Sequence, residues 1–182
     1  GALSRAIPDR VLADGSAGLW NTQLEGHDRD GRMFACIFFS AGGMGARPLA
    51  DGLSATAFPS GIKGVPAEAI EAVSPVLLLK RALRPDSGGA GKYRGGLGQE
   101  MVLQMDTDRP VLHSCMYDRT RSPARGFIGG KDGAVGELIL SDGSVPHPKG
   151  KYEIQPGQTV TLRLPGGGGF FSPLERNPER VL

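Results

Sequence analysis

One loop of the sequence combines charged side chains with glycine amides. The stretch "LRPDSGGAGKYRGGLGQ" runs from Leu83 to Gln99 and contains six glycines. Arginine forks hold carboxylate or phosphoryl oxygens through paired hydrogen bonds, and glycine amides supply further neutral donors. The loop could therefore bind an anionic or strongly polar ligand. Its candidate substrate-binding residues are Arg84, Asp86, Ser87 and Arg94.

The same side chains also permit a purely structural interpretation. Arg84 can form an ion pair with Asp86, and the neighbouring Asp86 and Ser87 can close an Asx-type turn. In that case the charged groups stabilise the loop and meet no ligand. The sequence leaves both interpretations open.

Three glycine runs raise the question of phosphate binding. The runs "GGMG", "SGGAGKYRGG" and "PGGGG" can form concave nests of amide groups, because glycine adopts positive φ and has no Cβ. A phosphate-binding loop, however, is followed by the N-terminus of a helix. Here the strand-like "GQEMVLQM" follows, and Tyr93 stands after Lys92 where the P-loop has Ser or Thr. We interpret the runs as tight structural turns.

A second candidate region is the long irregular stretch of residues 42–65. It contains six glycines and two prolines and shows no sustained hydrophobic period. Segments of this length inside compact domains are usually functional or packed as a unit. Its candidate substrate-binding residues are Arg47, Asp51 and Ser54.

The sequence predicts no complete metal site and no nucleophilic triad within this chain. Its three histidines, at positions 27, 113 and 147, share no local spacing with other ligand types. His113 and Cys115 would lie on one face of a strand, but the surrounding "PVLHSCMYD" is typical of a core strand. No third group that could orient a Cys–His pair is evident, and no GxSxG motif occurs.

The elements that must position these residues are mostly strands. Alternating and apolar runs bounded by turn residues predict a mainly β fold with minor α (α+β), in which antiparallel strands are joined by long Gly/Pro-rich loops. We expect the whole chain, residues 1–182, to form a single domain. Strands are expected at 33–40, 76–79 and 137–140, in a hairpin of 100–106 with 109–118 that turns at Thr107 and Asp108, and on both sides of Pro156; helical turns are expected at 2–6 and 67–73.

Composition excludes several classes of partner. The net charge is only +2 and the basic residues form no runs, so neither nucleic acid nor an anionic membrane is an expected partner. The two cysteines lie in strand-like apolar runs, which favours buried thiols and a reducing, cytoplasmic location. No apolar run is long enough to span a membrane. The chain begins with Gly1, and we expect it to be a piece of something longer.

The order of the motifs is more specific than any one of them. The chain resembles the C-terminal part of the hydantoinase B/oxoprolinase family over nearly all of its length. A small departure is "GGGGFFS", where "GGGGYG" is expected. The motifs that carry the resemblance are "AIPDRV", "GGMGARPLADGLSATAFPSG", "GVPAEAIEAVSPVLL", "LRPDSGGAGKYRGGLGQ", "DRTRSPARGFIGG" and "LPGGGGFFSPLERNPERVL".

The resemblance implies part of an ATP-dependent enzyme that acts on a small cyclic amide or a ketone. A hydantoinase A-type partner subunit would handle ATP, and the implied chemistry is phosphorylation of a carbonyl-derived oxygen followed by nucleophilic attack. The family's metal motifs belong to an N-terminal portion that this chain lacks. ATP and a divalent metal are thus expected for a full hetero-oligomeric complex, and no cofactor is expected to be bound by this chain alone.

Two hypotheses follow for this chain. In the first, its loops contribute the seven candidate residues to a site that the rest of the enzyme completes. In the second, it is a non-catalytic scaffold or assembly module whose glycine loops serve only as architecture.

Overall fold

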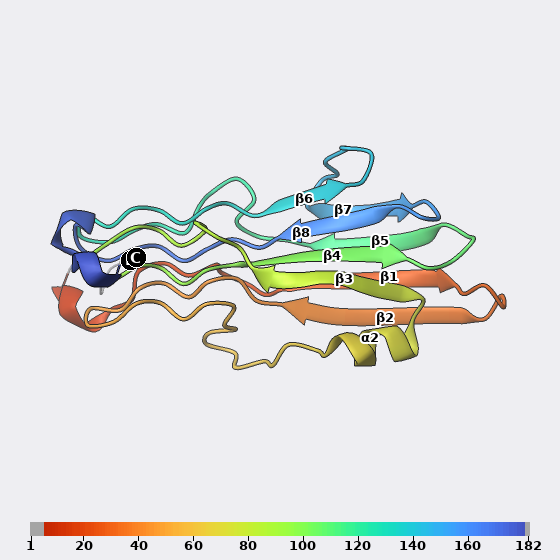
Figure 1. Ribbon diagram of the computed structural model, residues 1–182, viewed down its shortest axis with the longest axis horizontal. Helices are drawn as coiled ribbons and strands as arrows, with labels where there is room; N and C mark the ends of the chain where they lie inside the picture. The colour runs from red at the N-terminus through yellow and green to blue at the C-terminus, as the bar shows by residue number, and fades with distance from the viewer. Residues whose placement is uncertain (1–5, 181–182) are drawn as a thin grey trace.

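The computed structural model describes residues 6–180 as two four-stranded antiparallel sheets with a bundle of extended loops at one end (Figure 1). The strand orders are β2-β1-β5-β7 and β3-β4-β8-β6. The elements are η1 (Pro8–Arg10), β1 (Trp20–His27), β2 (Met33–Ser40), α2 (Ala67–Val73), β3 (Val76–Leu83), β4 (Gln99–Met105), β5 (Val111–Met116), β6 (Glu137–Leu140), β7 (Lys149–Ile154), β8 (Thr159–Arg163), η2 (Pro173–Glu175) and η3 (Pro178–Arg180).

The two sheets enclose the main hydrophobic core. Side chains alternate between buried and partly exposed along β4, as the period of a strand requires when one face packs on a core. Met101 and Leu103 of β4 and Trp20 and Leu24 of β1 are all buried in the same cluster. The sheets therefore form a β-sandwich, and the predicted mainly β, antiparallel fold is confirmed.

Several predicted elements are confirmed at their expected positions. The aromatic run of residues 33–40 forms β2, the run of residues 137–140 forms β6, and residues 67–73 form α2. Cys36 and Cys115 are buried and unbridged, as expected of reduced thiols. The helical turn expected over residues 2–6 lies outside the described residues except for Ala6.

The predicted hairpin between β4 and β5 is wrong. β4 pairs with β3 and β8, whereas β5 pairs with β1 and β7 in the other sheet. The connection thus crosses between the sheets. The hydroxyl of Thr107 donates to the carbonyl of His27 at 2.8 Å, which ties this connection to the end of β1.

Two further strands differ from expectation. The strand expected at residues 76–79 extends to Leu83, and Val76 is its only buried residue, because β3 lies at the edge of its sheet. β1 was not predicted at all, although it lies inside its sheet between β2 and β5. Its buried positions include Thr22, a polar residue that weakens the apolar alternation of "WNTQLEGH".

The glycine-rich segments form a second compact unit beyond the ends of the strands. We call this unit the glycine bundle. Its extended segments run side by side and exchange backbone hydrogen bonds, although they belong to no regular sheet (Figure 1). The glycine bundle comprises residues 13–16, 42–46, 87–98, 124–134 and 165–170.

Residues 165–170, "PGGGGF", form the axis of the glycine bundle. Every residue of this run is buried. The amide of Gly167 donates to the carbonyl of Gly96, and the amide of Gly168 donates to the carbonyl of Asp14. At Gly167 a Cβ would collide with the backbone of Met44, so only glycine allows the segments to approach this closely. The glycine runs are thus built into the architecture, but as extended segments that pack side by side and not as the tight turns that we expected.

Candidate functional site

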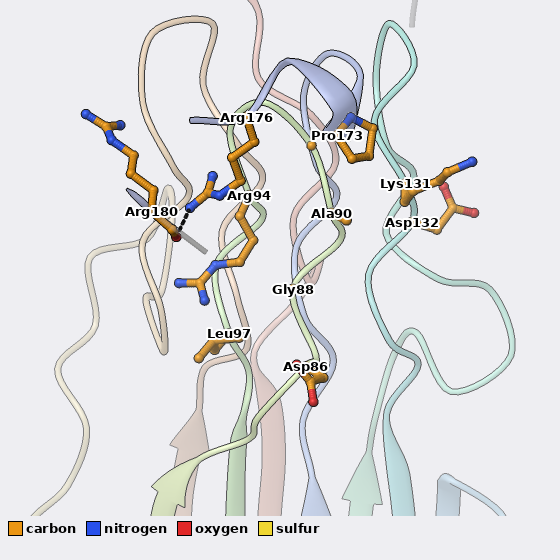
Figure 2. A pocket seen from close by; sticks show the side chains of 11 residues that line it. Asp86, Gly88, Ala90, Arg94, Leu97, Lys131, Asp132, Pro173, Arg176 and Arg180 are labelled. Carbon is orange, nitrogen blue, oxygen red and sulfur yellow. Dashed lines mark hydrogen bonds between the residues drawn. The ribbon is translucent and has the colours of Figure 1, made fainter. Parts of the chain in front are cut away.

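A cavity of about 640 Å³ lies along the glycine bundle, from Asp86 near the end of β3 to the C-terminal 3-10 turns (Figure 2). Three parts of the chain line it: the 86–97 loop, the 131–132 turn and the C-terminal 3-10 turns. Ligand sites for small molecules commonly have volumes of this order. Six of its lining residues carry charged side chains, namely Asp86, Arg94, Lys131, Asp132, Arg176 and Arg180.

Arg176 is fixed beside this cavity by Asp51. Its two terminal nitrogens each donate to one carboxylate oxygen of Asp51, both at 2.9 Å. The hydrogen bonds from Arg176 hold the pKa of the Asp51 carboxyl below its ordinary value of 3.8. Asp51 is therefore ionised at neutral pH and neutralises Arg176.

Asp51 also organises the loops around it. Its Oδ1 accepts a hydrogen bond from the amide of Arg94 at 2.7 Å. Arg47 donates from Nε and Nη2 to the backbone carbonyl of Asp51, at 3.2 and 2.8 Å. The structure thus brings Arg47, Asp51 and Arg94 together, as parts of one hydrogen-bonded network that Arg176 completes.

Arg94 and Asp86 are the two candidate residues whose charges stay available at the cavity. Among residues 6–180 no acceptor contacts the guanidinium of Arg94, and its Nε is buried without a partner. Asp86 is exposed and makes no ion pair within the described part of the chain. Its backbone adopts φ of +55°, a strained conformation for a residue other than glycine. A ligand with a donor and an acceptor could use both groups.

The ion pair between Arg84 and Asp86 considered above is not formed. Arg84 points instead to the start of β6, where it donates to the carbonyl of Val135 at 2.7 Å and to the carboxylate of Glu137 at 2.6 Å. This guanidinium lies outside the cavity. Its contacts connect the end of β3 to the opposite edge strand of the same sheet.

Ser54 and Ser87 hold backbone groups of the same loop. The hydroxyl of Ser87 donates to the carbonyl of Arg84 at 2.7 Å and accepts from the amide of Gly98 at 2.9 Å. The hydroxyl of Ser54 accepts from the amide of Leu97 at 3.0 Å. Neither serine lines the cavity, and each one fixes the shape of the 83–99 loop.

Sequence reasoning missed the residues that complete the cavity wall. Lys131, Asp132, Arg176 and Arg180 were not among the candidates. The two arginines were missed because the C-terminal segment resembles an unstructured tail. The sequence does contain one signal that this segment is ordered. Pro173 and Pro178 each begin a short 3-10 turn, and the arginines follow directly in "PLERNPER".

The described residues, 6–180, contain no candidate metal centre. No three His, Cys, Asp or Glu side chains within residues 6–180 are placed to hold a metal ion. His113 and Cys115 share a buried face, but the imidazole hydrogen-bonds to the hydroxyls of Tyr117 and Tyr152 and leaves the thiol aside. The thiol contacts the carbonyl of His147 instead. None of the described helices combines the length and apolarity needed to cross a membrane.

Comparison with known proteins identifies the family. A sequence model described as hydantoinase B/oxoprolinase matches residues 1–173. The chain belongs to this family. An uncharacterized protein, MJ0963, of Methanocaldococcus jannaschii is 38% identical over 185 residues, which cover 100% of this chain and 32% of that protein. The caprolactamase subunit beta of Pseudomonas jessenii is 32% identical over 202 residues, which cover 100% of this chain and 33% of the subunit.

A solved structure of the same family shows the same fold. The crystal structure of the ATP-dependent caprolactamase from Pseudomonas jessenii matches with a TM-score of 0.81 and 30% identity, over 99% of this chain and 33% of that chain. The chain thus spans about a third of the length of these relatives. The family membership expected from the ordered motifs is confirmed.

Proposed function

We propose that this chain is the C-terminal part of a B-type subunit in an ATP-dependent enzyme that hydrolyses a cyclic amide, and that it works with a hydantoinase A-type partner. The observation that supports this most strongly is the match to an ATP-dependent caprolactamase along 99% of the chain, at 30% identity. Family membership over residues 1–173 supports the same assignment.

In this proposal Arg94 and Asp86 bind and orient the substrate or its ring-opened product. The Arg94 guanidinium donates to the amide carbonyl oxygen, or to the carboxylate that forms when the ring opens. The Asp86 carboxylate accepts from the amide N–H, or from the ammonium group of the product. Both residues line the cavity, and neither has another ion-pair partner within residues 6–180.

ATP and a divalent metal would be held elsewhere in the full complex. The described residues offer no cluster of metal ligands, and the glycine runs are occupied by backbone packing. We therefore assign no step of phosphoryl transfer to this chain. Its own contribution is to bind and orient a polar ligand between two fixed loops.

The test uses the full-length subunit with its partner and measures ATP-dependent opening of caprolactam, hydantoin and 5-oxoproline. We expect Arg94→Ala and Asp86→Asn each to lower kcat/KM about tenfold or more, because each removes a charged hydrogen bond to the ligand. Arg125→Ala is the matched control, since Arg125 is exposed and lies outside the cavity. Unchanged kcat/KM in both cavity variants would reject this role for the cavity.

The internal hydrogen bonds of Arg84 and Ser87 favour a second candidate function, that of a scaffold for subunit assembly. Under this alternative, Arg84→Ala lowers stability or assembly and leaves the activity per assembled complex intact. Size-exclusion chromatography of the variant, with and without the partner, measures assembly. If Arg94→Ala also leaves turnover intact, the scaffold function is the better account.

A further inference from the structure

A second cavity lies at the "DRTRS" turn that follows β5. It has a volume of about 410 Å³ and is lined by Ala17 and by residues of the 117–122 and 147–149 segments. None of its residues belongs to the first cavity, the one along the glycine bundle. Its polar lining includes Arg119, Thr120, Arg121, Ser122, His147 and Lys149.

Positive charge predominates in this second cavity. Two arginines and a lysine line it, against the single carboxylate of Asp118. Lys149 pairs with Asp118 at 2.6 Å, and Arg119 pairs with Asp14 at 3.5 Å. Arg121 is exposed and makes no ion pair within residues 6–180. A full positive charge is therefore left without a counterion beside the cavity.

The backbone of the turn is equally rich in free donors. None of the amides of residues 118–122 donates a hydrogen bond to another described residue. Arg119 has φ of +59°, in the left-handed region. Such a residue turns successive amides toward one side, which is how backbone nests bind anions.

Side-chain donors add to these amides. Thr120 and Ser122 line the cavity, and their hydroxyls have no hydrogen-bond partner within the described part of the chain. The Nε of Arg119 is buried and unpartnered, while its Nη1 donates to the carbonyl of Pro123 at 2.9 Å. The latter bond holds the backbone of the turn in shape before a ligand arrives.

We infer that this turn binds a tetrahedral oxyanion, a phosphate group, through the Arg121 guanidinium, the free amides and the two hydroxyls. The turn combines guanidinium, hydroxyl and amide donors, and this number of donors suits the three or four acceptor oxygens of a tetrahedral oxyanion better than the two oxygens of a carboxylate. The inference concerns a different cavity from the one in the proposed function and is independent of catalytic activity.

The test measures binding of inorganic phosphate, methyl phosphate, sulfate and acetate to the purified chain by isothermal titration calorimetry at low salt. We expect phosphate and sulfate to bind more tightly than acetate. Tighter binding of methyl phosphate than of inorganic phosphate would place the phosphate group on an organic ligand, and the reverse order would indicate free phosphate; either order supports the site.

Variants locate the binding. Arg121→Ala should weaken phosphate binding about tenfold, because it removes a charged donor. Ser122→Ala should weaken it by a smaller factor. Arg125→Ala is the matched control in the same segment, because its side chain is exposed and lies outside the cavity. Arg94→Ala, in the first cavity, should leave the phosphate affinity unchanged.

Several results would overturn the inference. These are the absence of phosphate binding by the wild-type chain, equal binding of acetate, and equal losses in Arg121→Ala and Arg125→Ala. A loss of phosphate binding in Arg94→Ala alone would place the anion in the other cavity. Circular dichroism tests whether each variant keeps its fold. If Arg121→Ala is unfolded, Arg121→Gln takes its place.

Discussion

Arg176 and Asp51 form a two-pronged ion pair across 125 residues of sequence. Each of its two hydrogen bonds measures 2.9 Å, and the Arg176 side chain is only 14% exposed. This pair fastens the last 3-10 turns to the long 42–65 segment, and Arg176 itself lines the cavity in Figure 2. This wall of the cavity therefore depends on a contact between two segments that lie far apart in the sequence.

Replacing Arg176 should destabilise the protein. Arg176→Ala leaves the Asp51 carboxylate partly buried without its main partner, and we expect a loss of about 2 kcal/mol in the free energy of unfolding. Arg176→Lys keeps the charge but not the paired hydrogen bonds, so its free energy of unfolding should fall by a smaller amount. Urea unfolding at pH 7 measures both. A change below about 0.5 kcal/mol in Arg176→Ala would contradict this role.

The same pair makes a prediction for acid. The folded-state pKa of Asp51 is lowered, so its contribution to stability is complete above its unfolded value of 3.8 and is lost as the pH falls through the folded pKa. Below pH 4 the wild-type stability should therefore fall more steeply than that of Arg176→Ala. Unfolding curves at half-unit steps between pH 2.5 and 4 compare the two slopes.

His113 should make the protein acid-sensitive in a higher pH range. Burial lowers the pKa of its imidazole from 6.5 to about 4. Between these values the unfolded chain binds a proton that the folded chain does not, so stability falls as the pH falls. The resulting loss between pH 7 and pH 4.5 is about 2 kcal/mol.

The control for this prediction removes the titrating group. His113→Phe should abolish the pH dependence between 6.5 and 4, whatever its effect on the stability at pH 7. The hydroxyls of Tyr117 and Tyr152, which both contact the imidazole, remain in this variant. Chemical unfolding at pH 6.5 and at pH 4 measures the stability of both proteins. If His113→Phe loses as much stability between these pH values as the wild type, the acid sensitivity belongs to other groups.

A row of alternating charges crosses the outer face of one sheet. Arg163 of β8 contacts Glu100 of β4 at 3.4 Å and Glu137 of β6 at 3.1 Å, and Arg84 and Lys80 extend the row at its two ends. Arg84→Ala should lower the free energy of unfolding by about 2 kcal/mol, since Arg84 is largely buried and also bonds a backbone carbonyl.

Lys80 provides the comparison within the same row. Its side chain is half exposed, so Lys80→Ala should change stability by less than about 0.5 kcal/mol. Thermal unfolding of both variants at low and high salt measures the difference. Equal losses in the two variants would show that burial does not decide the strength of these contacts.

Glycine positions inside the bundle should not accept a methyl group. A Cβ on Gly43 would overlap the carbonyl of Gly96 and crowd the amide of Gly167, so Gly43→Ala should lose about 3 kcal/mol or more, or fail to fold. Gly150 in β7 has open space around it, so Gly150→Ala should not lower the free energy of unfolding. The yield of folded protein and its melting temperature distinguish the two variants.

Much of the sandwich could be predicted because local signals coincide with tertiary ones. The runs of residues 33–40 and 137–140 mark their strands without reference to the rest of the chain. The pairing of strands could not be predicted from such local signals. Whether the residues after β4 return to the same sheet or cross to the other depends on contacts such as that of Thr107 with His27, 80 residues apart.

The candidate site was predictable only in part, for the same reason. Adjacent charges in the 83–99 loop suggested that Arg84 pairs with Asp86, yet its carboxylate partner is Glu137, 53 residues away. Asp51 was identified, while its partner Arg176 lay in a segment without a clear pattern. Sequence spacing thus indicates which residues carry charge, and the fold decides which of them remain free.

The glycine bundle restricts how this protein can change. A clash between two side chains can be relieved by making the second one smaller. In the bundle, the group that a new Cβ would meet is most often a backbone carbonyl, such as that of Gly96 opposite Gly43 or that of Met44 opposite Gly167. Every residue type carries that carbonyl, so no second substitution at the contact can restore the fit. A search for suppressor mutations should therefore recover only reversion to glycine at these positions.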